Sequence, residues 1–277
     1  MRVFLKTILT SRAELPFIIA QFLELENLID RIVVIEPGFT HTGMPRERVG
    51  VADLIRLVPR ISAKLDYVPI PMTGAVLQSV EDDEPSCHFN ERLTRGLFLN
   101  YIELSPRDIV VSTDADEVLY ARVVEQEIER IRSKVFAWKA TRLGLHQFVY
   151  RDDLLATGFR FGGPSIIGNG RYFLSQKSMH WRYAGKHLKE IAGCHFSWCQ
   201  PIPDLLRKVA TFAHAPDYLK SGIDAKKAIQ DDIANLRYSF RTPTLQLERL
   251  EDPVAYWPSG YCEARLLIKN YGFDQNA

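Results

Sequence analysis

Residues 3–36, VFLKTILTSRAELPFIIAQFLELENLIDRIVVIE, have the pattern of a strand, a helix and a second strand. Val3–Leu9 is an apolar run suited to a strand, and Ser11 with Glu14 has the form of a capping box. Arg31–Glu36 is a short, almost wholly apolar strand that ends in an acid. The helix is predicted by apolar residues at helical spacing, namely Leu15, Ile18, Ile19, Phe22, Leu25 and Ile29. A strand–helix–strand unit of this kind predicts a parallel sheet.

The rest of the chain extends this α/β pattern. Apolar runs predict further strands at Leu65–Ile70, Asp108–Thr113 and Val135–Thr141. Periodicity predicts helices at Phe89–Leu104, Ile202–Ala213 and Asp224–Phe240, and glycines predict a loop region at Gly158–Gly170. The chain has no internal repeat and no clear linker. We therefore predict one domain, residues 1–277, with a helical C-terminal elaboration.

Composition excludes several classes of protein. The 277 residues are 46% hydrophobic and 25% charged, as in ordinary globular proteins. A net charge of +1 gives no footprint for nucleic acid or for an anionic membrane. No apolar run approaches the ~18 residues that a membrane span needs. The polar N-terminus lacks the features of a signal peptide, so we expect a cytoplasmic protein, at most peripheral to a membrane.

Four cysteines are too few for a disulfide scaffold, and we expect them to be reduced. Cys194 and Cys199 flank His195, which raises the question of a zinc site. Their spacing is not Cys-x2-Cys, and no second cluster of Cys and His lies nearby in the sequence. The pattern therefore disfavours zinc.

Acidic residues crowd the end of the strand predicted at Asp108–Thr113. The stretch Ser112–Val118, STDADEV, places Asp114 and Asp116 one residue apart on a turn. Ligands of open parallel sheets gather at the carboxyl ends of strands, and paired carboxylates suit Mg²⁺ or Mn²⁺. The alternative is a solvated acidic turn or a group of acids at a helix N-terminus. The preceding buried strand favours the metal.

Single residues elsewhere are less specific. Glu36 also ends a strand, where an acid can bind the hydroxyl or amide groups of a nucleotide or can simply belong to a turn. His195 could be a metal ligand, a hydrogen-bond donor to a diphosphate, or a core histidine. His214 could equally interact with a helix dipole. Tryptophans could stack on a sugar, although buried ones usually belong to the core: Trp181, Trp198 and Trp257.

Several motifs are missing. The sequence has neither GxGxxG nor a P-loop, and it lacks the G-x-S-x-G of a nucleophile elbow. A phosphatase of the Asp-x-Asp-x-Thr type would need threonine at position 118, which is Val118. These absences disfavour classical dinucleotide enzymes, P-loop NTPases, serine hydrolases and that class of phosphatase.

In order and spacing, several segments resemble glycosyltransferase family 17, the β-1,4-mannosyl-glycoprotein N-acetylglucosaminyltransferases. Ser112–Val118 is similar to the family's DADE segment, and Ala192–Cys199, AGCHFSWC, resembles its AGWH-x-SWC stretch. Cys194 departs from the family's usual tryptophan, and the membrane anchor and stem of the animal members are missing. Shorter matches are Val34–Glu36 with Thr40–Gly43, Glu91 with Arg95, Lys208–His214, and Leu266–Tyr271.

This resemblance implies a GT-A-like α/β fold with a Rossmann-type, mostly parallel sheet flanked by helices. Residues 1–120 would form the nucleotide-sugar-binding half, and 121–277 the acceptor-binding half with C-terminal helices. The implied reaction is metal-dependent, inverting transfer of a sugar, GlcNAc, from a UDP-sugar to a hydroxyl of a glycan or glycoconjugate. Mn²⁺ or Mg²⁺ would stabilise the leaving diphosphate.

The resemblance also implies roles for particular residues. The metal would be held by Asp114, Asp116 and His195. The catalytic residues would be Asp116, His195 and Glu117, although Glu190, Asp152 and Asp153 are other candidates for the base that an inverting reaction needs. The nucleotide-sugar would be bound by Thr10, Arg12, Glu36, Arg95, Asp114, Trp198, Lys208 and His214.

Two other functions stay open. A sugar-phosphate nucleotidyltransferase shares the fold and the acidic pair, but it usually has a glycine-rich, basic N-terminal signature that Leu9–Ala13 lacks. A non-catalytic module that binds carbohydrate or cations would use the same acids structurally.

Overall fold

The strand–helix–strand unit predicted from residues 3–36 is present in the computed structural model. It consists of β1 (Val3–Ile8), a 3₁₀ turn η1 (Arg12–Glu14), α1 (Leu15–Leu25) and β2 (Arg31–Pro37). The two strands run parallel. The structure describes residues 1–71, 86–133, 140–163, 165–175, 185–211, 222–240 and 243–270.

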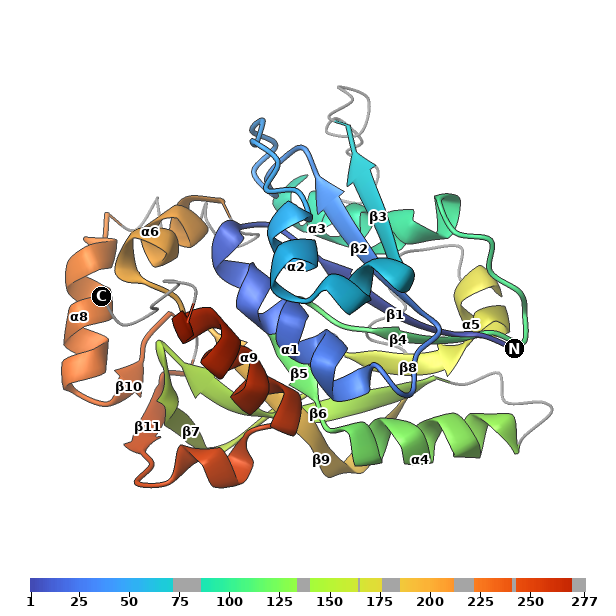
Figure 1. Ribbon diagram of the computed structural model, residues 1–277. Coiled ribbons are helices and arrows are strands. Elements are labelled where there is room, and N and C mark those ends of the chain that lie inside the picture. The colour runs from blue at the N-terminus through green and yellow to red at the C-terminus, as the bar shows by residue number, and fades with distance from the viewer. Residues whose placement is uncertain are drawn as a thin grey trace.

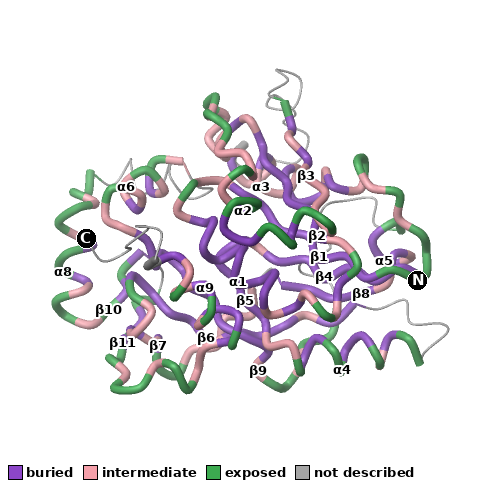
Figure 2. Tube along the Cα trace, viewed as in Figure 1, coloured by how far each residue is buried: buried purple, intermediate pink, exposed green. Residues whose placement is uncertain are grey.

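Four parallel strands form the N-terminal half of the sheet. The order is β3 (Leu65–Ile70), β2, β1 and β4 (Ile109–Ser112), and all neighbours in this set are parallel. The central strands are buried on both faces (Figure 2), which explains their continuous apolar sequences. Because all four strands end at the same edge, the segments that follow β1, β2 and β4 meet there.

Largely antiparallel strands extend the sheet beyond β4. Along the sheet they are β8 (Ile166–Asn169), β6 (Thr141–Val149), β7 (Arg151–Phe161), β11 (Leu245–Arg249) and β10 (Arg237–Tyr238). A branch leaves β6: the strand β9 (Lys186–Ser197) runs parallel to it and pairs antiparallel with the short β5 (Glu117–Leu119). This branch brings the acidic turn beside the end of β9.

Helices cover both faces of the sheet (Figure 1). One face packs against α1, α2 (Ala52–Leu57), α4 (Ala121–Arg132) and α9 (Ser259–Asn270), and the other against η3 (Leu97–Asn100) and α5 (Gly170–Ser175). The helix α3 (Ser86–Gly96) leads into η3; η2 (Pro59–Ala63) and η5 (Pro253–Tyr256) are further short turns. The predicted α/β class, with a Rossmann-type parallel sheet flanked by helices, is confirmed.

A separate aromatic cluster supports the helices α6 (Ile202–Thr211) and α8 (Ala225–Ala234). It contains Tyr150, Trp198, Tyr238 and Phe240, and the apolar side of α6 packs on it through Leu205 and Val209. This packing holds α6 above the carboxyl edge of the sheet. None of the helices among the described residues is both long enough and apolar enough to cross a bilayer.

The structure corrects several predicted elements. Gly158–Gly170 is not a loop throughout, because it contains the end of β7 and the whole of β8; Gly158 interrupts β7 with a φ of +63°. The helix predicted at Asp224–Phe240 ends at Ala234, and β10 follows it. Most of the strand predicted at Val135–Thr141 lies outside the described residues. The strand β9 was missed because its first half alternates little and carries many charges.

Candidate functional site

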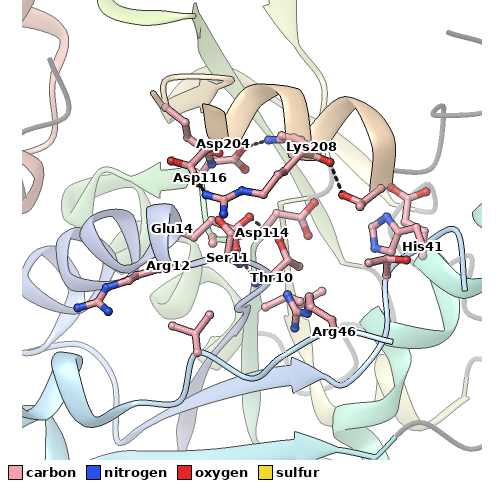
Figure 3. A pocket seen from close by; sticks show the side chains of 18 of the residues that line it. Thr10, Ser11, Arg12, Glu14, His41, Arg46, Asp114, Asp116, Asp204 and Lys208 are labelled. Carbon is pink, nitrogen blue, oxygen red and sulfur yellow. Dashed lines mark hydrogen bonds and ion pairs between the residues drawn. The ribbon is translucent and has the colours of Figure 1, made fainter. Parts of the chain in front are cut away.

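A cavity of about 860 Å³ opens at the carboxyl edge of the sheet. Its lining comes from the loop after β1, the loop after β2, α3, the acidic turn after β4, the end of β9, and α6. Figure 3 shows acids and bases from these elements facing one another, with Asp116 near Lys208, and with Arg46 and His41 on another side. The cavity therefore lies where the parallel sheet was expected to bind a ligand.

Arg95 on α3 fixes the first aspartate of the acidic turn. Its Nε donates to Oδ1 of Asp114 at 3.0 Å, and its Nη2 donates to Oδ2 at 2.5 Å. Its Nη1 lies 2.8 Å from Oε1 of Glu91. Although burial alone would lower the pKa of Arg95, the two carboxylates raise it. The guanidinium is thus a permanent cation, and its bidentate contact sets the orientation of Asp114.

Asp116 is held by nitrogen-bearing side chains from two other elements, Lys208 on α6 and His195 on β9. Its Oδ2 accepts a hydrogen bond from Nζ of Lys208 at 3.1 Å, and its Oδ1 lies 3.5 Å from Nε2 of His195. Burial alone would raise the pKa of Asp116, but Lys208 and His195 hold it well below its usual range. The carboxylate is therefore charged at neutral pH, although it is only 7% exposed.

His195 is brought to Asp116 by the pairing of β9 with β5, in which Glu117 lies opposite His195. Its Nδ1 lies 2.9 Å from Oε1 of Gln147, and Phe161 packs on its ring at 4.0 Å between centroids. An amide oxygen only accepts, so Nδ1 carries the hydrogen. The Nε2 atom, which faces Asp116, then either binds a cation through its lone pair or carries a second proton.

Glu117 stabilises the turn from within. Its Oε2 accepts the hydroxyl of Ser165 at 2.6 Å and the backbone N–H of Asp114 at 3.2 Å. Gln21 on α1 binds the same turn through three backbone oxygens, those of Asp114, Ala115 and Glu117. Since Glu117 is fully buried, its contacts are those of a residue that shapes the turn, although it also borders the cavity.

Glu14 is a site residue that the sequence indicated only as part of a capping box. Its carboxylate accepts the backbone N–H of Ser11 at 3.1 Å and the hydroxyl of Thr10 at 2.7 Å, and it lines the cavity. Burial raises its pKa, against the opposing effect of Lys208. Gln147 and Arg46 were likewise missed, because no local pattern marks a glutamine or an arginine that acts across strands.

The donor set at Asp116 suits a divalent cation. A carboxylate oxygen and an imidazole nitrogen 3.5 Å apart can share one ion, and the contact of Nδ1 with Gln147 is typical of a metal-binding histidine. Asp114 instead faces Arg95. Within the described ranges, no three His, Cys, Asp or Glu side chains converge as a complete metal site.

The predicted nucleotide-binding residues are only partly brought together. Thr10, Arg95, Asp114, Trp198 and Lys208 line the cavity with Asp116 and His195. Trp198 has a φ of +62°, at the point where β9 ends.

Arg12 lies at the rim, points away from the centre of the cavity (Figure 3), and pairs with Asp53 at 2.7 Å. Glu36 is fully buried and does not line the cavity; its oxygens bind backbone N–H groups and a phenol. His214 lies outside the described residues.

The alternative bases lie elsewhere. Glu190 pairs with Arg122, Asp152 accepts the hydroxyl of Tyr261, and Asp153 pairs with Arg151. None of these three acids lines the cavity. Glu117 is therefore the member of the predicted set that borders it.

The cysteines beside His195 have structural contacts. The Sγ of Cys194 lies 3.1 Å from the carbonyl oxygen of Tyr256, and that of Cys199 lies 3.8 Å from the oxygen of Ser197. Burial raises the pKa of both thiols. Among the described residues, the printed contacts of both sulfurs are with backbone carbonyls or a phenol.

A parallel sheet with charged side chains at its carboxyl edge is typical of α/β proteins that bind ligands there. The family model of glycosyltransferase family 17 matches residues 1–240 of the chain. The chain therefore belongs to glycosyltransferase family 17. No curated protein matches it.

Solved structures resemble it only distantly. The galactosyltransferase LgtC, in complex with donor and acceptor sugar analogues, has a TM-score of 0.39 and 9% identity, over 63% of this chain and 60% of that one. The 4-diphosphocytidyl-2C-methyl-D-erythritol synthase has a TM-score of 0.40 and 12% identity, over 76% of this chain and 98% of that one. Mouse xyloside xylosyltransferase 1 has a TM-score of 0.34 and 9% identity, over 68% of this chain and 78% of that one. The chain spans three fifths of the galactosyltransferase, and similarities this distant support no statement about function.

Proposed function

We propose that the chain transfers a sugar, GlcNAc, from a UDP-sugar to a hydroxyl of a glycan or glycoconjugate, with inversion and with the help of Mn²⁺ or Mg²⁺. Membership of glycosyltransferase family 17 supports the class of reaction. The observation that carries the proposal is Asp116, a buried carboxylate kept charged at a strand end and facing a cavity of about 860 Å³.

In this proposal the cation binds through Asp116 and His195, and Asp114 contributes while it shares its charge with Arg95. When bound, the cation would neutralise the diphosphate that leaves with the electrons of the glycosidic bond. Lys208 would supply a second positive charge at the same place, because its pKa is raised by Asp116 and Glu14 against the effect of burial. Gln147 would keep Nε2 of His195 available for the cation.

The two halves of the chain would divide the substrates. Residues 1–120 would hold the nucleotide, with Thr10 in the loop after β1, and 121–277 would hold the acceptor. Trp198 lines the cavity and is the aromatic candidate for contact with a sugar. Glu117 borders the cavity and is the candidate for the base, although its contacts with Ser165 and Asp114 also give it a structural role.

A donor screen tests this function. Purified chain is mixed with UDP-GlcNAc, other UDP-sugars and UTP, with and without Mn²⁺, and both thermal stability and slow donor hydrolysis are recorded. The proposal predicts that UDP-GlcNAc with Mn²⁺ raises the melting temperature and is hydrolysed, and that Asp116→Asn abolishes both effects. Absence of any response to UDP-sugars would contradict it.

A further inference from the structure

We propose that Glu36 is a positioning residue that fixes one wall of the cavity, and that it does not contact the nucleotide. The wall is Pro45–Val49, five consecutive residues that all line the cavity. Its assignment as the donor-side wall rests on the proposed function. The positioning itself rests only on contacts within the chain.

The carboxylate of Glu36 is bound by the segment that carries the wall and by Tyr67 of β3. Its Oε1 accepts the backbone N–H of Val49, and its Oε2 accepts the N–H of Gly50 at 3.0 Å and the phenol of Tyr67 at 2.6 Å. The side chain is 0% exposed. No oxygen of Glu36 is thus directed at the cavity, and a ligand could reach it only by displacing these donors.

Gly50 explains how one carboxylate binds two successive N–H groups. Its φ is +72°, a left-handed conformation that glycine adopts readily. Two successive N–H groups beside a residue in this left-handed conformation form a concave site that binds anions, and the carboxylate of Glu36 occupies it. The sequence therefore places the carboxylate at the end of β2 and, in the loop that follows, the glycine whose conformation allows two N–H groups to bind that carboxylate.

Arg46 fastens the same wall to the strand ends. Its Nε donates to the carbonyl of Pro37 at 3.1 Å, its Nη2 donates to the carbonyl of Leu9 at 3.0 Å, and its Nη2 lies 4.0 Å from Glu36. Arg46 and Val49 therefore hold the two ends of the wall against β2 and against the residue that follows β1. Since Thr10 follows Leu9, the wall is also held in place relative to the loop after β1.

The test is Glu36→Gln, which keeps the size of the side chain but places an amide NH₂ against backbone donors. Hydrogen exchange of a peptide covering residues 45–51 should become at least about tenfold faster, since the amides of Val49 and Gly50 lose a charged acceptor. The KM for UDP-GlcNAc should rise about tenfold, with kcat changed less than about threefold.

Two further variants make the result specific. Asp108→Asn alters another buried carboxylate that binds two backbone N–H groups, but at the opposite edge of the sheet. It should lower stability without changing exchange at 45–51 or the KM. Gly50→Ala strains the left-handed backbone, although its Cβ meets no atom within 4 Å, and should act like Glu36→Gln without altering any charge.

Unchanged exchange at 45–51 in Glu36→Gln would overturn the positioning role, whatever the enzyme binds. Faster exchange with an unchanged KM would overturn its link to the donor. A fall in kcat at constant KM would instead make Glu36 a participant in the chemistry and would also overturn the proposal. If the wild type binds no UDP-sugar, the proposed function fails, while the exchange experiment still decides whether Glu36 holds the wall.

Discussion

The two edges of the parallel sheet use the same residue types in opposite ways. At the amino edge, Asp108 binds the backbone N–H groups of Arg2 and Ser105 as well as the guanidinium of Arg2. Lys64 donates to the carbonyls of Glu26 and Ile29. At the carboxyl edge, Asp116 and Lys208 bind each other beside a cavity.

Backbone partners cannot leave, so the charges of the amino edge stabilise the fold. Side-chain partners can rotate away, and in our proposal Asp116 and Lys208 exchange each other for a cation and a ligand. Asp108 and Asp116 are 2% and 7% exposed, so burial does not distinguish them. The kind of partner distinguishes a charged side chain that stabilises the fold from one proposed to act in the site.

The largest effect is expected for Asp116→Asn. The substitution removes the negative charge that pairs with Lys208 and His195 and, in our proposal, with the cation. We expect a loss of about 10³-fold in kcat/KM for transfer or donor hydrolysis. Steady-state kinetics measure it, with Asp108→Asn as the matched acid at the other edge. Comparable losses in the two variants would show that the comparison between the edges is wrong.

The second-largest effect is expected for Lys208→Met, which should reduce kcat about 10²-fold. Its ammonium group is the nearest fixed cation to Asp116, and methionine keeps the apolar part of the side chain. Lys64→Met is the control, because it removes a half-buried lysine whose partners are backbone carbonyls. We expect the control to lower the melting temperature and to leave kcat unchanged. A normal kcat in Lys208→Met would remove Lys208 from the reaction.

Asp108→Asn should lower the free energy of unfolding by about 2 kcal/mol at pH 7. Burial alone would raise the pKa of Asp108, but its donors hold it below the ordinary 3.8. Its stabilising effect is therefore complete above pH 3.8 and is lost as the pH falls through the lower folded-state pKa. Urea unfolding at several pH values should show the gap between wild type and variant closing below that pH. A gap independent of pH would contradict this.

Arg12→Ala should have the smallest effect. The side chain of Arg12 is 63% exposed and pairs with Asp53 at the rim, where ion pairs contribute about 0–1 kcal/mol. We expect less than about a threefold change in the KM for the donor. A tenfold rise would restore the direct nucleotide contact suggested by the family resemblance.

Local patterns in the sequence were enough to predict the start of the fold. The strand–helix–strand unit and β3 follow from apolar runs and periodicity, and β3 has the predicted bounds of Leu65–Ile70. The strands beyond β4 were not predicted, because β7 contains a glycine and β9 carries many charges. Their pairing with β6 depends on contacts between residues distant in the chain, which periodicity does not contain.

The residues of the candidate site likewise fall into those that the local sequence indicates and those that depend on contacts between distant segments. Asp114, Asp116 and Lys208 were identifiable, because acids after a buried strand and a family-like lysine are visible in the sequence. The position of His195 opposite Glu117 depends on strand register. Glu36 looked like a ligand contact because it ends a strand, but Val49 and Gly50 use its carboxylate. A strand-end acid is therefore a site residue only if the following loop leaves it exposed to the cavity.

The most direct test of the central claim is calorimetric titration of UDP into wild type and Asp116→Asn, each with and without Mn²⁺. If Asp116 joins the cation to the diphosphate, Mn²⁺ should tighten UDP binding at least about tenfold in the wild type, or about 1.4 kcal/mol, and should have no effect in the variant. Equal UDP affinity with and without Mn²⁺ in the wild type, or an undiminished effect of Mn²⁺ in Asp116→Asn, would contradict the account.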